Sequence, residues 1–219
     1  MISRIELHHL LPDVFRGAEN DEPVRSSQIW LRDVVFERGH RYLIEAESGT
    51  GKSSLLSFIY GNRNDYSGRI LFDGADLRSV RTGALCAIRR NSLALLPQEM
   101  RLFPELTAME NIEIKNRLTG FASHEQITAM LEQMEIAHKA DIPAGRLSIG
   151  QQQRVAIVRA LCQPTDFILL DEPVSHLDAR NNSIVASMIM EHADRQGAAI
   201  IATSVGNHIN IPNPEILRL

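Results

Sequence analysis

A glycine-bearing loop between an apolar run and a helix-forming segment constrains this chain more than any other feature. The run Tyr42–Ile44 has the length and character of a buried strand. The segment from Lys52 to Tyr60 is predicted to be a helix, and Gly61 after it is a typical helix stop. A buried parallel strand that turns directly into a helix is the unit from which α/β folds are built. The sequence therefore predicts an α/β core with a parallel sheet.

The loop itself has the composition of a phosphate-binding site. It reads Ala46, Glu47, Ser48, Gly49, Thr50, Gly51, Lys52 and Ser53, and Ser54 follows in the helix. Backbone N–H groups and the positive end of the helix can surround phosphate oxygens here, and the two glycines permit the close approach. Lys52 is expected to reach the β- and γ-phosphates, and Ser53 to give its hydroxyl to Mg²⁺. Ala46 replaces the usual first glycine, yet an ordinary glycine-rich turn is the weaker interpretation because the rest of the loop is intact.

A second strand-like run, Phe167–Leu170, ends in the carboxylates Asp171 and Glu172. Asp171 is expected to hold the Mg²⁺ shell, directly or through water, together with Ser53. Glu172 would then face the γ-phosphate and act as the general base on the attacking water. A strand that merely ends in solvated acids is the alternative interpretation, and the phosphate loop upstream makes it the weaker one.

The run from Leu147 to Arg154, Leu-Ser-Ile-Gly-Gln-Gln-Gln-Arg, resembles the signature sequence of ATP-binding cassette (ABC) ATPases. The resemblance implies that Ser148 and Gly150 contact the γ-phosphate of an ATP molecule held by an opposite subunit. Ile149 and Gln151 belong to the same motif, and Ile149 stands where a glycine is usual. The apolar residues that follow have the pattern of an amphipathic helix whose N-terminal end would point at the nucleotide. The signature therefore predicts a dimer as well as a ligand.

Three further positions fit the same family. Gln98 matches the glutamine that joins the core to a helical insert and senses Mg²⁺ and water. Phe15 lies where an aromatic residue stacks on adenine in relatives, although a plain core phenylalanine fits it equally well. The loop that would meet its twin across the dimer consists of Ser175, His176, Leu177 and Asp178. The resemblance extends from about Ile5 to Ser204.

The pattern breaks at one position. Relatives carry a histidine after the strand that follows the dimer loop, and this chain has Ser204 there. A serine hydroxyl carries no positive charge towards the γ-phosphate, and loss of one such contact commonly lowers the rate about a hundredfold. Either His208 folds back over the site from a turn at Gly206, or the protein hydrolyses ATP slowly and works through ATP-driven closure. A surface histidine is the simpler interpretation of His208.

The whole chain, 1–219, is expected to form a single ABC nucleotide-binding domain. The resemblance implies an α/β core in 1–98 and 162–219 with an antiparallel β layer near the N-terminus. It also implies a helical subdomain in 99–161 that carries the signature. The residues agree, since helix formers dominate the middle of the chain and strand character returns later, for example at Ala198–Ala202.

Charge and hydropathy limit the partners. The net charge of −4 argues against a nucleic-acid partner, because proteins that bind nucleic acids over their surface are basic. No apolar run approaches the roughly 18–20 residues that span a bilayer, and the N-terminus lacks the apolar stretch of a signal peptide. We therefore expect a cytoplasmic protein. Its two cysteines, Cys86 and Cys162, are expected to be buried and reduced.

The segment from Arg101 to Ile112 resembles the one that meets membrane subunits in the lipoprotein-release, macrolide-export and cell-division subgroup. The resemblance implies an ATP-binding and ATP-hydrolysing subunit of a membrane ABC complex. Two copies, as a homodimer or pseudo-dimer, would sandwich two ATP with Mg²⁺ and drive integral membrane permease-type subunits from the inner face of the cell membrane. Two alternatives stay open: a slow or non-hydrolysing ATP-gated clamp, favoured by Ser204, and a soluble ABC ATPase of translation or repair.

Overall fold

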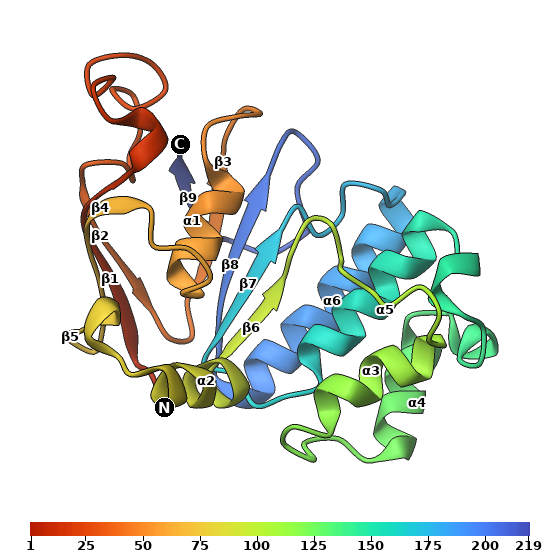
Figure 1. Cartoon of the computed structure of the whole chain (residues 1–219). Helices are drawn as coiled ribbons and strands as arrows, with labels where there is room; N and C mark the ends of the chain where they lie inside the picture. The colour runs from red at the N-terminus through yellow and green to blue at the C-terminus, as the bar shows by residue number, and fades with distance from the viewer.

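A five-stranded parallel sheet forms the centre of the computed structural model, which describes all 219 residues (Figure 1). Its strand order is β6-β7-β8-β3-β9. The strands are β3 (Arg41–Glu45), β6 (Leu93–Leu96), β7 (Phe167–Asp171), β8 (Ala199–Ser204) and β9 (Glu215–Arg218). Every residue of β7 and β8 is buried, because helices or the second sheet cover both faces of these central strands. The predicted α/β fold class is confirmed.

Alternate residues of the central strands enter two separate cores, because successive side chains of a strand point to opposite faces. The helices are α1 (Lys52–Ile59), α2 (Thr82–Asn91), α3 (Ala108–Asn116), α4 (His124–Gln133), α5 (Ile149–Leu161) and α6 (Ala179–Gln196). Ile168 and Leu170 pack with α5 and α6 on one face of the sheet. Phe167 and Leu169 pack with α1 and the N-terminal strands on the other face. Figure 1 shows α1 and the N-terminal strands on the opposite side of the sheet from α5 and α6.

An antiparallel sheet of order β2-β1-β4-β5 packs against α1 and supplies the predicted β layer. Its strands are β1 (Arg4–Pro12), β2 (Asp33–Glu37), β4 (Tyr66–Phe72) and β5 (Ala75–Asp76). Gly68 in β4 is needed for a close approach, because a Cβ there would lie 2.4 Å from the carbonyl oxygen of His9. The pairing of β1 with β4 shifts its register between His8 and Leu11, at the same place.

The helical insert of the predicted fold holds α3, α4 and α5. Each of these helices begins with a capping box, in which the side chains of the N-cap residue and of the residue three positions later bond to each other's backbone N–H. The pairs are Thr107 with Glu110, Ser123 with Gln126, and Ser148 with Gln151. Asn111 is fully buried in α3, and its side-chain amide donates to the carbonyl oxygens of Phe103 and Leu106. This amide fixes the segment that leads from Gln98 into the insert.

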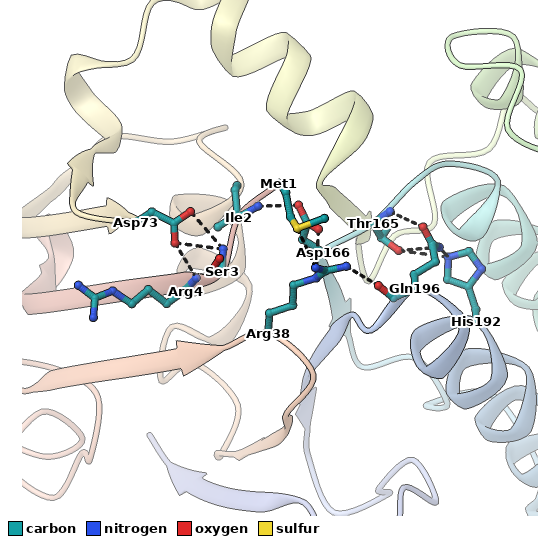
Figure 2. Close-up of polar contacts among 10 residues, drawn as sticks. All are labelled: Met1, Ile2, Ser3, Arg4, Arg38, Asp73, Thr165, Asp166, His192 and Gln196. Carbon is teal, nitrogen blue, oxygen red and sulfur yellow. Dashed lines mark hydrogen bonds and ion pairs between the residues drawn. The ribbon is translucent and has the colours of Figure 1, made fainter.

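The N-terminal residues are fastened to the start of β7, at the end of the sheet opposite the phosphate loop (Figure 2). Asp166 accepts a hydrogen bond from the backbone N–H of Ile2 at 2.7 Å and pairs with Arg38 Nε at 3.2 Å. Arg38 also donates to the carbonyl oxygen of Gln196 at the end of α6. In the turn after β4, Asp73 accepts from the backbone N–H groups of the two residues after Ile2. These contacts join the β layer, the parallel sheet and α6.

The expectation for the cysteines is half wrong. Cys162 is buried, and its burial raises the thiol pKa to about 12. Cys86 is exposed, because it lies on α2, a short helix in which no residue is buried. None of the helices combines the length and the apolar character that crossing a membrane requires.

Candidate nucleotide-binding site

The phosphate loop follows β3 at the carboxyl end of the parallel sheet, where ligands of open α/β sheets bind. Gly49 and Gly51 have φ angles of +86° and +100°, which favour glycine. A Cβ on Gly51 would lie 2.9 Å from Cζ2 of Trp30, a fully buried residue whose Nε1 donates to the carbonyl oxygen of Thr50 at 3.0 Å. Trp30 therefore packs against the phosphate loop and holds it by a hydrogen bond. It was not among the predicted site residues, although it is the only tryptophan in the chain.

Phe15 lies on the same side of the loop. Its Cε2 would be 3.5 Å from a Cβ on Gly51, and its half-buried ring packs against the core that contains Trp30. The position suits a residue that touches a base bound beside the loop, and it also suits a plain core phenylalanine. Stacking of Phe15 on adenine stays a prediction.

Lys52 lies under the loop with only 5% of its side chain exposed. Its Nζ donates to the carbonyl oxygen of Glu47 at 2.7 Å and lies 3.9 Å from Glu172 Oε1. Burial lowers the pKa of Lys52, and the nearby carboxylates of Glu172 and Asp171 oppose that shift. The ammonium group is thus positioned between the loop and the acidic end of β7.

A hollow of about 270 Å³ opens above this lysine. Its lining residues are Ser48, Gly49, Gly51, Lys52, Ser53, Ser54, Gln98 and Glu172. None of them is hydrophobic. Hydroxyl groups, backbone N–H groups and one ammonium group suit the oxygen atoms of a phosphate chain better than an apolar ligand. The structure therefore brings together residues from the loop, from the end of β6 and from the end of β7.

The two carboxylates at the end of β7 lie in different surroundings. Asp171 is buried, and its Oδ1 accepts a hydrogen bond of 2.8 Å from Thr203 Oγ1. The same Thr203 oxygen accepts from the backbone N–H of Glu172 at 3.2 Å. The parallel pairing of β7 with β8 brings Asp171 opposite Thr203. Sequence reasoning missed Thr203, and its place next to Ser204 at the end of a buried strand was the available signal.

Glu172 projects into the hollow from a left-handed backbone, with a φ of +49°. Its carbonyl oxygen accepts from Gln153 Nε2 at 3.3 Å and from Ser175 Oγ at 3.2 Å. Its carboxylate accepts from Gln98 Nε2 at 3.3 Å. The backbone at Glu172 is therefore held from two sides, by the signature helix α5 and by the dimer loop. Gln153, which is buried on α5, is a third residue that sequence reasoning missed, after Trp30 and Thr203.

Ser204 and His208 lie in a neighbouring hollow of about 400 Å³, which shares Ala46 and Glu47 with the phosphate loop. The Ser204 hydroxyl is buried and donates to the carbonyl oxygen of Asn207 at 2.9 Å. The exposed His208 side chain has its Nε2 3.7 Å from Glu45 Oε1. Neither residue lines the hollow that contains Lys52 and Glu172.

The signature residues are held in a different way. Ser148 is the N-cap of α5, and its Oγ accepts from the backbone N–H of Gln151. Ile149 is 54% exposed beside it. A Cβ on Gly150 would lie 3.3 Å from Leu177 Cδ2 and 3.4 Å from the carbonyl oxygen of His176. The signature and the dimer loop thus form one exposed surface, and none of their residues lines the hollow above Lys52.

Asp178 at the end of the dimer loop is the N-cap of α6. It accepts from the backbone N–H of Asn181 at 2.8 Å, and this hydrogen bond lowers the pKa of its carboxyl group. Asp178 therefore has a structural role as the N-cap of α6.

A phosphate loop, an acidic strand end and a helix-borne signature on one α/β chain are the features of the ATP-binding cassette class. The family model for ABC transporters matches residues 32–175, which is more than half of the chain. The chain therefore belongs to the ABC transporter family.

The names of similar proteins agree with membership of this family. An ABC transporter ATP-binding protein of Mycobacterium tuberculosis is 32% identical over 202 residues, or 91% of this chain, and the chain spans 60% of that relative's length. The ABC transporter ATP-binding protein YbbA of Escherichia coli K12 is 30% identical over 90% of this chain and 86% of its own length. The lipoprotein-releasing system ATP-binding protein LolD of Shewanella frigidimarina is 33% identical over 78% and 73% of the two chains.

Solved structures share the fold. The dimeric structure of MJ0796, described as a bacterial ABC transporter cassette, has a TM-score of 0.73 at 25% identity and covers 91% of this chain and 87% of its own. The dimeric post-hydrolysis structure of MJ0796 bound to ADP and Pi has a TM-score of 0.72 at 28% identity, covering 81% and 79% of the two chains.

Proposed function

We propose that this chain is the ATP-hydrolysing subunit of a membrane transporter-type complex, and that two copies enclose two ATP molecules between them. One observation carries the proposal. Lys52, Gln98 and Glu172 line one hollow, whereas the exposed Ser148 and the partly buried Gly150 lie at the start of α5 outside that hollow. A signature that does not reach its own chain's phosphate loop is free to complete the loop of a second chain. The dimeric cassettes of MJ0796 support this arrangement.

The loop residues would hold the triphosphate. Backbone N–H groups of residues 46–54 and the N-terminus of α1 would bind the phosphate oxygens, with Lys52 on the β- and γ-phosphates. Phe15, beside Gly51, would stack on adenine. These contacts all come from one chain, so a monomer should bind ATP.

The oxygen donors near the loop fit Mg²⁺. They are the exposed hydroxyl of Ser53, the Asp171 carboxylate and Oε1 of Gln98, whose Nε2 is turned to Glu172. Mg²⁺ prefers oxygen ligands, and it is usually held by one or two carboxylates plus substrate phosphates rather than by a full protein cage. No group of three or more His, Cys, Asp or Glu residues that could hold a metal ion exists in the chain, in keeping with that mode. When bound, the ion would neutralise phosphate charge.

Glu172 would act as general base. Its carboxylate takes a proton from the attacking water, the water oxygen bonds to the γ-phosphorus, and the bond from that phosphorus to the β–γ bridging oxygen breaks. ADP and inorganic phosphate are the products. The hydrogen bonds from Gln153 and Ser175 would hold the Glu172 backbone in place while the carboxylate works.

The helical insert would transmit the nucleotide state to membrane partners. We propose 1–98 and 162–219 as the core, 99–161 as the moving subdomain, and Gln98 as the hinge between them. Close to Gln98, the 101–112 segment carries Phe103, which is 50% exposed, and borders a small cavity of about 120 Å³. An exposed aromatic side chain beside a cavity suits a partner's helix, and the transporter names of the relatives support integral membrane subunits. The chain would then lie on the inner face of the membrane.

One observation favours a second function, an ATP-gated clamp with slow turnover. Ser204 turns its hydroxyl to Asn207, and His208 faces Glu45, so neither side chain supplies a cation to the hollow above Lys52. A site with fewer preorganised donors stabilises the developing charge less.

Turnover of Mg²⁺-ATP across a range of protein concentrations tests the proposal, with Lys52→Ala as the blank. We expect activity above the blank that rises faster than linearly with protein, because two chains complete each site. Activity at the blank level with ATP still bound would favour the clamp. The proposal that two chains share each ATP site would be contradicted if turnover were strictly proportional to protein concentration and the chain stayed monomeric with ATP.

A further inference from the structure

His176 is an exposed histidine on the dimer loop, and it lies against the signature. Its carbonyl oxygen is 3.4 Å from the position of a Cβ on Gly150, and its neighbour Leu177 lies 3.3 Å from the same position. The signature and the exposed His176 therefore lie next to each other on one surface of the chain. If Ser148 and Gly150 meet the γ-phosphate on a second chain, His176 enters the same interface.

The ring of His176 is oriented by its neighbour. Ser175 Oγ lies 3.2 Å from the carbonyl oxygen of Glu172 and 3.0 Å from Nδ1 of His176, and it forms a hydrogen bond with each of them. The hydrogen bond at Nδ1 leaves Nε2 as the nitrogen available to a ligand. In the doubly protonated ring, Nδ1–H stays on Ser175 while Nε2–H is offered outwards.

The hollow that would hold the phosphates is lined by few cationic side chains. Lys52 is the only cationic side chain that lines the hollow above the loop, and it faces the Glu172 carboxylate at 3.9 Å. Ser204 is neutral, and His208 is directed to Glu45. Beside a bound Mg²⁺, the negatively charged γ-phosphoryl oxygens of the transition state would meet one cationic side chain of their own chain.

We propose that His176 is a catalytic residue that acts across the dimer, where its Nε2–H donates to the γ-phosphate bound by the opposite chain. The proposal rests on the sandwich arrangement of the proposed function. Each γ-phosphate then contacts Lys52 of its own chain and the partner's His176. Because Ser175 joins His176 to the backbone of Glu172, the base at one site is mechanically linked to the cation at the other.

Replacement of the histidine gives the first test. His176→Ala is expected to lower kcat roughly tenfold or more, while the ATP affinity of the monomer stays unchanged, because the residue lies outside its own chain's hollow. His124→Ala is the matched control, since His124 is exposed on α4 away from the signature and should turn over ATP normally. Normal kcat in His176→Ala would overturn the proposal.

Mixed dimers decide whether the histidine acts on the other chain. His176→Ala is held at a fixed concentration, and a Glu172→Gln chain is added in increasing amounts. In the mixed dimer, the phosphate loop and Glu172 of the first chain meet an intact His176 of the second, so one site is complete. Turnover per His176→Ala chain should therefore rise several-fold. The control partner carries both Glu172→Gln and His176→Ala and should give no rise.

Equal turnover with the two partners would overturn the trans role of His176. The proposed function is tested separately in the same samples, because the Glu172→Gln chain alone should form an ATP-dependent dimer in size-exclusion chromatography. A Glu172→Gln chain that stays monomeric with ATP would reject the sandwich itself, and with it the assignment of His176. A Glu172→Gln dimer with no difference between the two partners would reject His176 alone.

Discussion

The hollow at the phosphate loop and the exposed surface of the signature and dimer loop differ in how they are held. At the hollow, buried groups such as Trp30, Lys52 and Thr203 fix the loop and the acidic strand end through contacts between distant parts of the chain. At the exposed surface, Ser148 is held mainly by a local capping box. The first region is complete within one chain, whereas the second has its functional groups directed to solvent. ATP binding should therefore survive damage to the exposed surface, and turnover should not.

The largest effect is expected at the hollow. Lys52→Ala removes the charge-assisted contact to the phosphates and should weaken ATP binding by about a hundredfold or more. Equilibrium binding of ATP to the monomer measures this loss. Lys139→Ala, on a partly exposed turn of the helical insert, is the control and should bind normally. Unchanged affinity in Lys52→Ala would break the assignment of the loop.

The exposed surface is tested by Ser148→Arg, which places a bulky cation where a second chain must approach. Turnover should fall to the level of the Lys52→Ala blank, while ATP affinity of the monomer stays within about twofold, because the signature contributes nothing to its own chain's hollow. Ser123→Arg is a close control, since Ser123 caps α4 with the same type of capping box. If Ser148→Arg destroyed binding by the monomer, the two regions would not be separate.

A smaller effect on turnover is expected at Thr203, which hydrogen-bonds to Asp171 at the acidic end of β7. Thr203→Val keeps the shape of the side chain but leaves the buried Asp171 carboxylate without its 2.8 Å hydrogen bond. We expect a loss of about 1–3 kcal/mol in the free energy of unfolding and a roughly tenfold lower kcat. Denaturant unfolding and turnover measure the two quantities. Thr203→Ser, which keeps the hydroxyl, should restore most of the stability and most of kcat. A fully active Thr203→Val would show that the Thr203 hydroxyl is not needed for turnover.

The change with the smallest effect on ATP turnover lies outside both regions and concerns the dependence of stability on pH. His192 in α6 is buried, with its Nε2 3.2 Å from Thr165 Oγ1, and burial lowers its pKa to about 4. The ring is therefore neutral in the folded chain but binds a proton in the unfolded chain near pH 6.5. Its contribution to stability is present above that pH and is lost as the pH falls towards 4, by up to roughly 3 kcal/mol.

Unfolding free energies of the parent and of His192→Gln, measured between pH 7 and pH 4, check this expectation. The parent should lose more stability than the variant over that range, because the variant has no group to titrate there. Parallel curves would show that His192 does not titrate differently in the two states.

Part of this site could be read from the chain because its residues are adjacent in sequence. The phosphate loop, the pair Asp171-Glu172 and the signature are each short runs, so their spacing alone predicts which backbone groups and side chains meet a ligand. The central strands were found for the same reason, since an uninterrupted apolar run such as Phe167–Leu170 is typical of a strand buried on both faces.

The groups that sequence reasoning missed are those held by contacts across the fold. Trp30 supports the loop from 20 residues away, and Gln153 on α5 bonds to the backbone of Glu172 on β7. Cys86 was expected to be buried, yet it is exposed because α2 packs too lightly to cover it. No local pattern reports which of many polar or aromatic side chains will meet a given loop after folding.

The sequence by itself determined the family and the α/β core, and it predicted the residues that would bind the phosphates, because these depend on local runs and their spacing. Only the tertiary structure decided that Ser204 turns to Asn207, that His208 faces Glu45, and that His176 lies against Gly150. Those outcomes depend on how the ends of β7 and β8 and the start of α5 are brought together. The parallel sheet and the packing of α5 against it set that geometry, and no single segment of the chain encodes it.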